Sequence, residues 1–503
     1  MINRLRRWLG LRPPAPYHSH PGGSTGPPPR HTPPLRRVLP PPSAQWVWLS
    51  YESQTYGSAE LRANPLVILV IADLMGDADK PAGESPEEAL LTLTDNDPGL
   101  LLRTLRPQLT LQVSTDPPTS VTLRFETMAD FTPAGLARQV GSPALVAAVR
   151  RHPDFQHLRE RWHGLACLAD AAGTDGLVVI RVLPTSLASL HRDWLADTTD
   201  AGQHPLATLL RHAGPWCYQA PPISLVVADY RFEESPGHGA ILTRLVGIGA
   251  DLCAPVLAEV GPALLGLSRW ADFSTLDTTA LDSLRRSADT RFLGLVAAGD
   301  GSVTGISGAH AVATLVVRAF RREGWTVRVS GERWGVLDPP ATGGADEGAA
   351  PAIIDADPRR LADLGLMAIT RCDGADAPTL CSDPTLQAPG RSEVRLGVLL
   401  ACCRVAHYLQ CSRRDRLGAF QEREDVEREL NDWLGQLIHP APDEVSPDGA
   451  FEQPLRSATL TVSECMGNPG YYLGRLEIQP LLHAGATQPL TLDVEIPIDP
   501  IFS

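Results

Sequence analysis

The residues best suited to acid–base chemistry lie in one short stretch near the middle of the chain. Asp229 ends an apolar run, and Glu233, Glu234 and His238 follow it closely. Sites in α/β proteins lie where strands end at their carboxyl termini, and carboxylates beside a histidine can exchange protons with a substrate. The same residues also suit a loop that caps the following helix. We favour the capping interpretation, because no other carboxylate or histidine motif in the chain has ligand spacing.

A glycine-rich stretch is the second feature that could carry chemistry. Gly299, Gly301 and Gly305 follow an apolar run and precede a helical pattern. A dinucleotide-binding turn needs the spacing G-x-G-x-x-G in that context, with an acidic residue about twenty positions later. Here the third glycine comes one position late, and residues 318–322 hold arginines. We therefore interpret the stretch as a loop and predict no nucleotide cofactor.

Residue counts exclude several other chemistries. Lys80 is the only lysine, and proline and alanine follow it, so the chain has no phosphate-binding Walker lysine. The nine cysteines form no C-x-x-C pair, which is typical of reduced thiols and provides no metal cage. Motifs such as G-x-S-x-G and H-E-x-x-H are also absent from the sequence. We predict no catalytic residue, no cofactor and no metal.

The charge balance argues against nucleic acid as a partner. Acidic residues outnumber basic ones by 58 to 44 in 503 residues, and the formal net charge is −14. A phosphate backbone is bound through many Lys and Arg contacts. Residues 1–42 are the exception, with seven arginines and no acid in a Pro- and Gly-rich stretch, which predicts a disordered basic tail. The apolar runs are too short to span a membrane, so we predict a cytoplasmic protein.

The periodicity of apolar residues predicts two folded units, residues 43–142 and 143–503. The first reads as a small α+β unit and the second as a larger α/β unit that ends in a β-meander, since its strands and helices alternate. In the first unit we expect strands at 46–50, 65–72, 109–113 and 121–125 and helices at 98–105 and 133–140. In the second we expect strands at 177–183, 223–229, 292–297, 326–329, 457–463, 473–479 and 490–496, and helices at 152–171, 239–253, 309–323, 394–410 and 420–438.

Short motifs follow in a fixed order along residues 152–496. They include HPDFQ at 152–156, SADTRFLGL at 287–295, RVAHYL at 404–409 and DVERELNDWL at 425–434. In this order they resemble the large subunit of the type VI secretion contractile sheath, the TssC or VipB family. Two earlier motifs, PLVILVIADLMG at 65–76 and LRFETMADFTPAGLARQV at 123–140, resemble the small sheath subunit, TssB or VipA. The chain therefore resembles a fusion of both sheath components.

The resemblance implies a non-enzymatic structural component of a contractile sheath, which surrounds an inner tube and contracts to drive protein export. It implies four kinds of partner: other sheath protomers, the inner tube protein, a baseplate and a disassembly ATPase. In the family, the small subunit continues into a C-terminal helix and strand, and the large subunit begins with an arm and a helix that the ATPase reads. Only residues 141–151 lie between the two matches here, so we expect both elements to be missing.

Two segments are candidate contact surfaces under this resemblance. The strand at 490–496 is the expected assembly arm, because it alternates apolar and polar residues between two prolines and could pair with a neighbouring sheet. Its residues are Leu490, Thr491, Leu492, Asp493, Val494, Glu495 and Ile496. The charged helix at 420–438 either lies in solvent or faces the tube or another partner. Its candidate residues are Glu422, Asp425, Arg428 and Glu429.

Two other functions stay open at the level of sequence. The expected loss of the arms favours an accessory sheath paralogue that caps or regulates assembly without polymerising. A nucleotide-dependent α/β enzyme would instead use Asp229 and the glycine-rich stretch.

Overall fold

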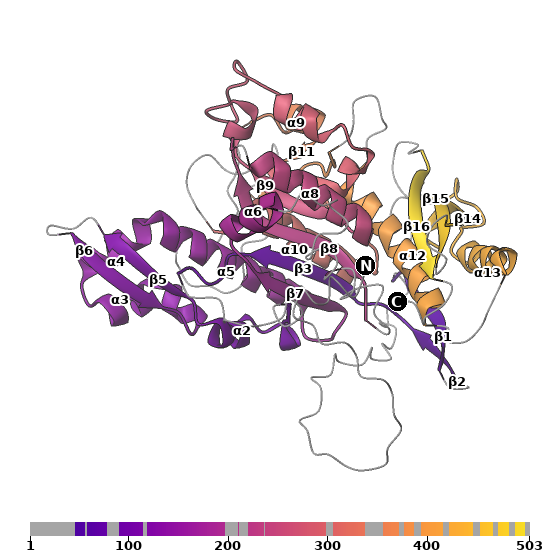
Figure 1. Cartoon of the computed structure of the whole chain (residues 1–503), viewed down its shortest axis with the longest axis horizontal. Coiled ribbons are helices and arrows are strands. Elements are labelled where there is room, and N and C mark those ends of the chain that lie inside the picture. Colours follow the sequence, from indigo (N-terminus) through magenta and orange to yellow (C-terminus); the bar gives the residue numbers. More distant parts are fainter. Residues whose placement is uncertain are drawn as a thin grey trace, which may run out of the picture. The chain divides into compact units, whose positions relative to one another are not determined.

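A seven-stranded sheet forms the centre of the computed structural model (Figure 1). The strand order is β11-β10-β9-β8-β3-β7-β4, and every neighbouring pair is parallel except β4 and β7. The strands are β3 (Leu66–Ala72), β4 (Leu91–Thr92), β7 (Val178–Pro184), β8 (Ile223–Phe232), β9 (Val256–Val260), β10 (Leu293–Ala297) and β11 (Leu366–Met367). Helices cover both faces, and the predicted α/β class is confirmed.

The structure describes most of the chain after residue 45. The described residues are 46–55, 58–77, 90–113, 118–196, 210, 220–235, 237–297, 305–337, 356–371, 377–386, 394–415, 422–445, 453–465, 471–481 and 488–497. The predicted tail, residues 1–42, and the glycines at 299 and 301 lie outside these ranges. Among the described residues, no helix is long and apolar enough to cross a membrane.

Strand β3 is buried on both of its faces. Its even-numbered residues face helices α5 (Pro153–Ala172) and α10 (Gly308–Glu323), and its odd-numbered residues join the core that contains α8 (His238–Leu252). Every residue of the strand is at most 1% exposed. A strand covered by helices on both sides needs apolar residues at every position, which explains the unbroken run LVILVIA.

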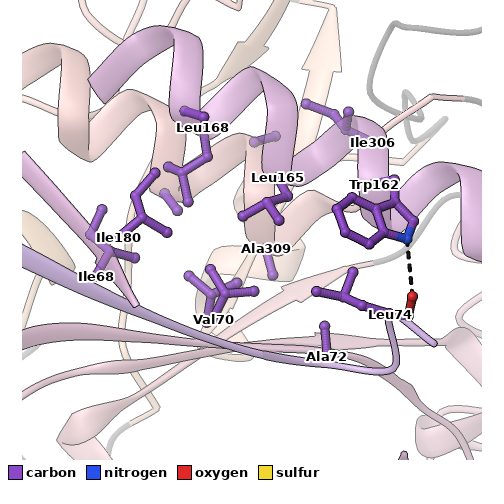
Figure 2. Packing of buried hydrophobic residues seen from close by; sticks show 14 of the residues in the cluster. Ile68, Val70, Ala72, Leu74, Trp162, Leu165, Leu168, Ile180, Ile306 and Ala309 are labelled. Carbon is purple, nitrogen blue, oxygen red and sulfur yellow. Dashed lines mark hydrogen bonds between the residues drawn. The ribbon is translucent and has the colours of Figure 1, made fainter. Parts of the chain in front are cut away.

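The core crosses the predicted boundary between residues 142 and 143. Strand β3 comes from the small-subunit-like segment, yet it pairs along its length with β7 on one side and β8 on the other. Helix α5 packs over the same strand, and Figure 2 shows Leu165 and Leu168 above Val70 and Ile68. The buried indole of Trp162 donates a hydrogen bond of 3.1 Å to the carbonyl of Leu74. The two sequence segments therefore share one core.

From residue 94 on, the small segment contains every predicted helix and strand, whereas the strands at 51–55, 58–62 and 91–92 were not predicted. It comprises η1 (Thr94–Asn96), α2 (Pro98–Leu105), β5 (Gln108–Val113), β6 (Thr119–Arg124), η2 (Met128–Phe131) and α3 (Pro133–Val140). Asp97 and Thr132 cap α2 and α3, because each side chain accepts a hydrogen bond from the first turn. Gly141 ends α3 at φ 70°, a conformation that glycine adopts easily. Ser142 then leads directly into α4 (Pro143–Arg151).

The C-terminal part forms a second sheet. Strands β14 (Leu455–Glu464), β15 (Tyr471–Pro480) and β16 (Leu490–Pro497) are antiparallel neighbours, as the predicted meander requires. Helix α12 (Leu396–Arg414) packs against β15 and β16, and α13 (Arg423–Gly435) lies along β14 (Figure 1). The hairpin of β1 (Tyr51–Thr55) and β2 (Ser58–Arg62) contacts α12.

The remaining elements are short or cover the edges of the central sheet. They are α6 (Leu187–Ala196), η4 (Pro262–Leu265), α9 (Thr279–Leu284), η5 (Ala288–Phe292), α11 (Pro358–Asp363), β12 (Ile369–Arg371) and β13 (Pro378–Leu380).

Two predicted strands are wrong. Residues 326–329 pair with no strand in the described part of the chain, although Val327 and Val329 are buried there. Residues 46–50 are extended, but ladder pairing begins only at Tyr51, and Val47 makes an isolated backbone hydrogen bond to Glu323. Burial of alternate side chains against helices produces the same sequence pattern as a strand, which accounts for both errors. The sequence analysis also missed β9.

Candidate assembly site

The predicted arm is an edge strand of its own sheet. β16 pairs with β15 from Leu490 opposite Ile478 to Pro497 opposite Tyr471. Leu492, Val494 and Ile496 are at most 1% exposed and pack in the core that contains α12. The strand is thus part of the folded protomer, and its role in contacts between protomers stays a prediction.

The outer edge of β16 is only partly occupied. Successive residues of an edge strand point their backbone groups alternately toward the sheet and away from it. Thr491 and Glu495 point outward, since their carbonyl oxygens accept hydrogen bonds from Arg291 (2.7 Å) and Gln410 (3.3 Å). Asp493 lies between them and shares this orientation. Among the described residues, nothing accepts a hydrogen bond from the N–H groups of Thr491 and Asp493.

The candidate residues of the charged helix do not form one surface. Glu422, at the N-cap of α13, is exposed, and Asp425 and Arg428 form an ion pair on the exposed side of the helix. Glu429 faces the body of the protein, where it lies 3.4 Å from Arg413 of α12, a side chain only 4% exposed. Three of the four predicted residues therefore face outward, and the fourth stabilises the contact between the two helices.

Aromatic contacts fix α13 in place. Trp433 stacks on Tyr408 of α12 with ring centroids 6.2 Å apart, and its indole N–H donates to the carbonyl of Ser50. Val426, Leu430 and Leu434 occur at helical spacing on the buried face. The outward residues of α13 are therefore held on a rigid element.

The structure separates the residues that could have done acid–base chemistry. Glu233 pairs with Arg231, and His238 hydrogen-bonds the backbone of Glu233 at the start of α8. Asp229 instead lies buried beside α10, with one carboxylate oxygen 3.4 Å from Nδ1 of His310. The predicted cap is wrong: the N-cap of α8 is Gly237 and no side chain caps it, because His238 bonds back to the loop. Asp229 faces a different helix, which begins about eighty residues later in the chain.

A second buried carboxylate lies at the same helix end. Glu259, from the end of β9, accepts a hydrogen bond of 2.6 Å from the N–H of Gly308 at the first turn of α10. Carboxylates are stabilised there by the unpaired N–H groups of the helix. The buried carboxylates of Asp229 and Glu259 therefore cover the N-terminus of α10 in the protein interior.

The two carboxylates titrate differently. Burial opposes ionisation of Asp229, but the neighbouring His310 ring, the charge of Arg161 and a hydrogen bond with Ser307 together outweigh it and lower the pKa of that carboxyl. Burial raises the pKa of Glu259 to about 7, and the charge of Asp229 adds to the rise. Burial also raises the pKa of Glu160, on the facing helix α5, to about 8. The interior therefore favours one ionised and two neutral carboxyls at mildly acidic pH.

Replacing Glu259 by glutamine should flatten the pH dependence of stability. An unfolded glutamate loses its proton near pH 4.5, whereas folded Glu259 keeps it to about pH 7, so the folded protein binds more protons and loses stability as the pH rises between these values. Glutamine stays neutral and can still accept from Gly308. In denaturant titrations, the free energy of unfolding of Glu259→Gln relative to that of the wild type should increase by more than about 1 kcal/mol from pH 5 to pH 8. If the free energies of unfolding of the two proteins change with pH in the same way, the raised pKa of Glu259 is contradicted.

Comparisons with known proteins match both parts of this fold. The model of the EvpB/VC_A0108 tail sheath N-terminal domain matches residues 142–300, and that of the EvpB/VC_A0108 tail sheath gpW/gp25-like domain matches residues 387–496. The model of type VI secretion system VipA, VC_A0107 or Hcp2 matches residues 42–162. The type VI secretion system sheath protein TssC1 of Pseudomonas aeruginosa is 28% identical over 398 residues, or 67% of this chain and 80% of that protein.

Fold and matches together define a structural protein of the contractile-sheath class. The chain belongs to the type VI secretion system sheath family and combines segments similar to its large and small subunits.

Sequence reasoning missed the polar side of α13 that faces β14. Arg423, Glu427 and Asn431 occur at intervals of four residues, which places them on one side of a helix. This four-residue spacing could have predicted that the three polar side chains share one side of the helix. The structure shows all three bonded to the backbone of β14.

Proposed function

We propose that this chain is a sheath protomer in which one polypeptide supplies what the family divides between two subunits. The observation that carries the proposal is the position of β3 between β7 and β8, because the small-subunit-like segment fills the centre of the large-subunit-like sheet. In this function the assembled protein surrounds an inner tube in the cytoplasm, docks on a baseplate and contracts to drive protein export. No residue has a catalytic role.

The outer edge of β16 is the proposed contact between protomers. An exposed strand edge with unbonded N–H groups can accept a strand from a neighbouring molecule, and backbone pairing depends little on side-chain identity. The outward N–H groups of Thr491 and Asp493 provide this edge, while Leu490, Leu492, Val494 and Ile496 anchor the strand in its own core. The strand would therefore contribute its edge and remain in its own protomer.

The outward side of α13 is the proposed contact with the inner tube protein. Glu422 and Arg428 are exposed there, and Asp425 is partly exposed, on a helix that aromatic contacts hold rigid. Charges placed on a rim of this kind act mainly on association rate and specificity, and salt screens them.

A second candidate function is an accessory paralogue that caps or regulates a sheath without polymerising. Two residues, Gly141 and Ser142, connect α3 to α4, and α5 follows one residue after α4 ends. This connection leaves no room for the arms and the ATPase-recognition helix of the separate subunits. A disassembly ATPase would have to recognise another segment.

Electron microscopy of the purified full chain, alone, with tube protein from the same organism, and with sheaths assembled from separate small and large subunits, tests both functions. A sheath protomer should form helical polymers and co-sediment with tube protein; an accessory protein should instead decorate the ends of sheaths built by separate subunits. Glu422→Arg with Asp425→Arg should weaken co-sedimentation several-fold at low salt and less at high salt. Glu52→Arg, exposed on β1, is the matched control. If the protein forms no polymers and also decorates no sheath ends, both functions are contradicted.

A further inference from the structure

The outer edge of β14 is closed by side chains of α13. The Nδ2 group of Asn431 donates to the carbonyl of Leu460 at 2.8 Å, and its Oδ1 accepts from the N–H of the same residue at 2.9 Å. One amide side chain thus forms the pair of hydrogen bonds that a neighbouring strand would form with Leu460.

The next outward residue of β14 is closed in the same way. The N–H of Val462 donates to the Glu427 carboxylate at 2.8 Å, and its carbonyl accepts from Arg423 at 2.9 Å. Leu460 and Val462 are two residues apart, so their backbone groups point to the same side of the strand. All four groups are therefore bonded to one face of α13.

The opposite edge of the sheet, formed by β16, is hydrogen-bonded only in part. On β16, Arg291 and Gln410 each bond a single carbonyl, and the N–H groups of Thr491 and Asp493 have no acceptor among the described residues. A strand that arrives at β16 finds donors to pair with. A strand that arrives at β14 would have to displace four hydrogen bonds and a packed helix.

An amide side chain also covers an edge of the two-stranded sheet formed by β5 and β6. Gln139 of α3 accepts from the N–H of Arg124 on β6 at 3.0 Å and donates to its carbonyl at 2.9 Å. Two amide side chains on different helices thus make a two-point contact with the backbone of an edge strand. Native sheets commonly cover an edge in order to prevent unwanted pairing.

We propose that Arg423, Glu427 and Asn431 close the β14 edge, so that strand addition to the C-terminal sheet is confined to β16. The proposal rests on the proposed function for its β16 half. It makes these three side chains determinants of assembly specificity, since an open β14 edge would allow a second, competing chain contact.

The test exposes the edge of β14 in a variant whose β16 edge can no longer pair with another strand. Asp493→Pro removes the central outward N–H of β16, and Glu427→Ala with Asn431→Ala then opens β14 while keeping good helix formers in α13. At equal concentration, the triple variant should show a severalfold larger sedimenting fraction than Asp493→Pro alone. Asp432→Ala, exposed on the same helix, is the control and should change nothing. A triple variant that stays folded and no more associated than Asp493→Pro would overturn the proposal.

Hydrogen exchange supplies a readout that does not depend on assembly. In the full chain, Asn431→Ala with Glu427→Ala removes the acceptors of the Leu460 and Val462 N–H groups, so exchange at residues 460 and 462 should rise at least several-fold. Residues 459 and 461, which bond to β15, should keep their protection. Equal rises at all four positions would indicate general unfolding of the strand and would overturn the edge role, whatever the outcome for β16.

Discussion

Asp493→Pro is expected to abolish polymer formation while leaving the protomer folded. Proline has no N–H and is tolerated on an edge strand where that N–H faces outward. Asp493 has this orientation, because its neighbours Thr491 and Glu495 direct their carbonyls to Arg291 and Gln410 at the outer edge. Only pairing with an added strand should be lost.

Two controls separate this effect from loss of the side chain or of the sheet. Asp493→Ala removes the exposed ion pair with Arg475 but keeps the N–H, and it should polymerise normally. Val494→Pro removes an N–H that points toward β15, and it should lower the melting temperature by many degrees. Polymer yield by electron microscopy and melting by circular dichroism are the measurements. Normal polymers from Asp493→Pro would place the contact between protomers elsewhere.

Splitting the chain between Gly141 and Ser142 should make the C-terminal fragment insoluble. Without β3, strands β7 and β8 would each expose a long apolar edge in the middle of the sheet. The strand carries six large aliphatic side chains, all at most 1% exposed. At about 1.5–3 kcal/mol for each buried side chain, their loss removes about 9–18 kcal/mol. That amount is as large as the whole stability of a typical domain, about 5–15 kcal/mol.

Co-expression of the two fragments should restore a soluble complex, because the split breaks only one peptide bond beside the exposed Gly141 and every core contact can still form between the fragments. The matched variant is Val70→Asp in the N-terminal fragment, which places an unpaired charge at the centre of the sheet and should abolish the rescue. Soluble yield and size-exclusion chromatography measure both results. A soluble C-terminal fragment with a cooperative melt would show that the shared core is dispensable.

Local chemistry made much of the assembly site predictable. The alternation of residues 490–496 between two prolines specified a half-buried strand, and β16 has that register. The spacing of Val426, Leu430 and Leu434 could likewise have identified the buried face of α13, although the sequence analysis did not use it. The direction of Glu429 toward Arg413 could not be predicted, because it depends on a helix that packs against α13 from another part of the chain.

Sequence by itself determined where most helices and strands begin and end, since caps such as Asp97 and Thr132 act within one turn of their own helix. It also determined the sheath family through the order of its motifs. Tertiary structure alone decided that β3 enters the middle of a sheet built mainly from the later segment, and that Asp229 faces α10. Both outcomes depend on packing between residues far apart in the chain, and periodicity reports which side of an element is buried without reporting what buries it. For the same reason, an alternating pattern at 326–329 could mark burial against neighbouring elements where no strand forms.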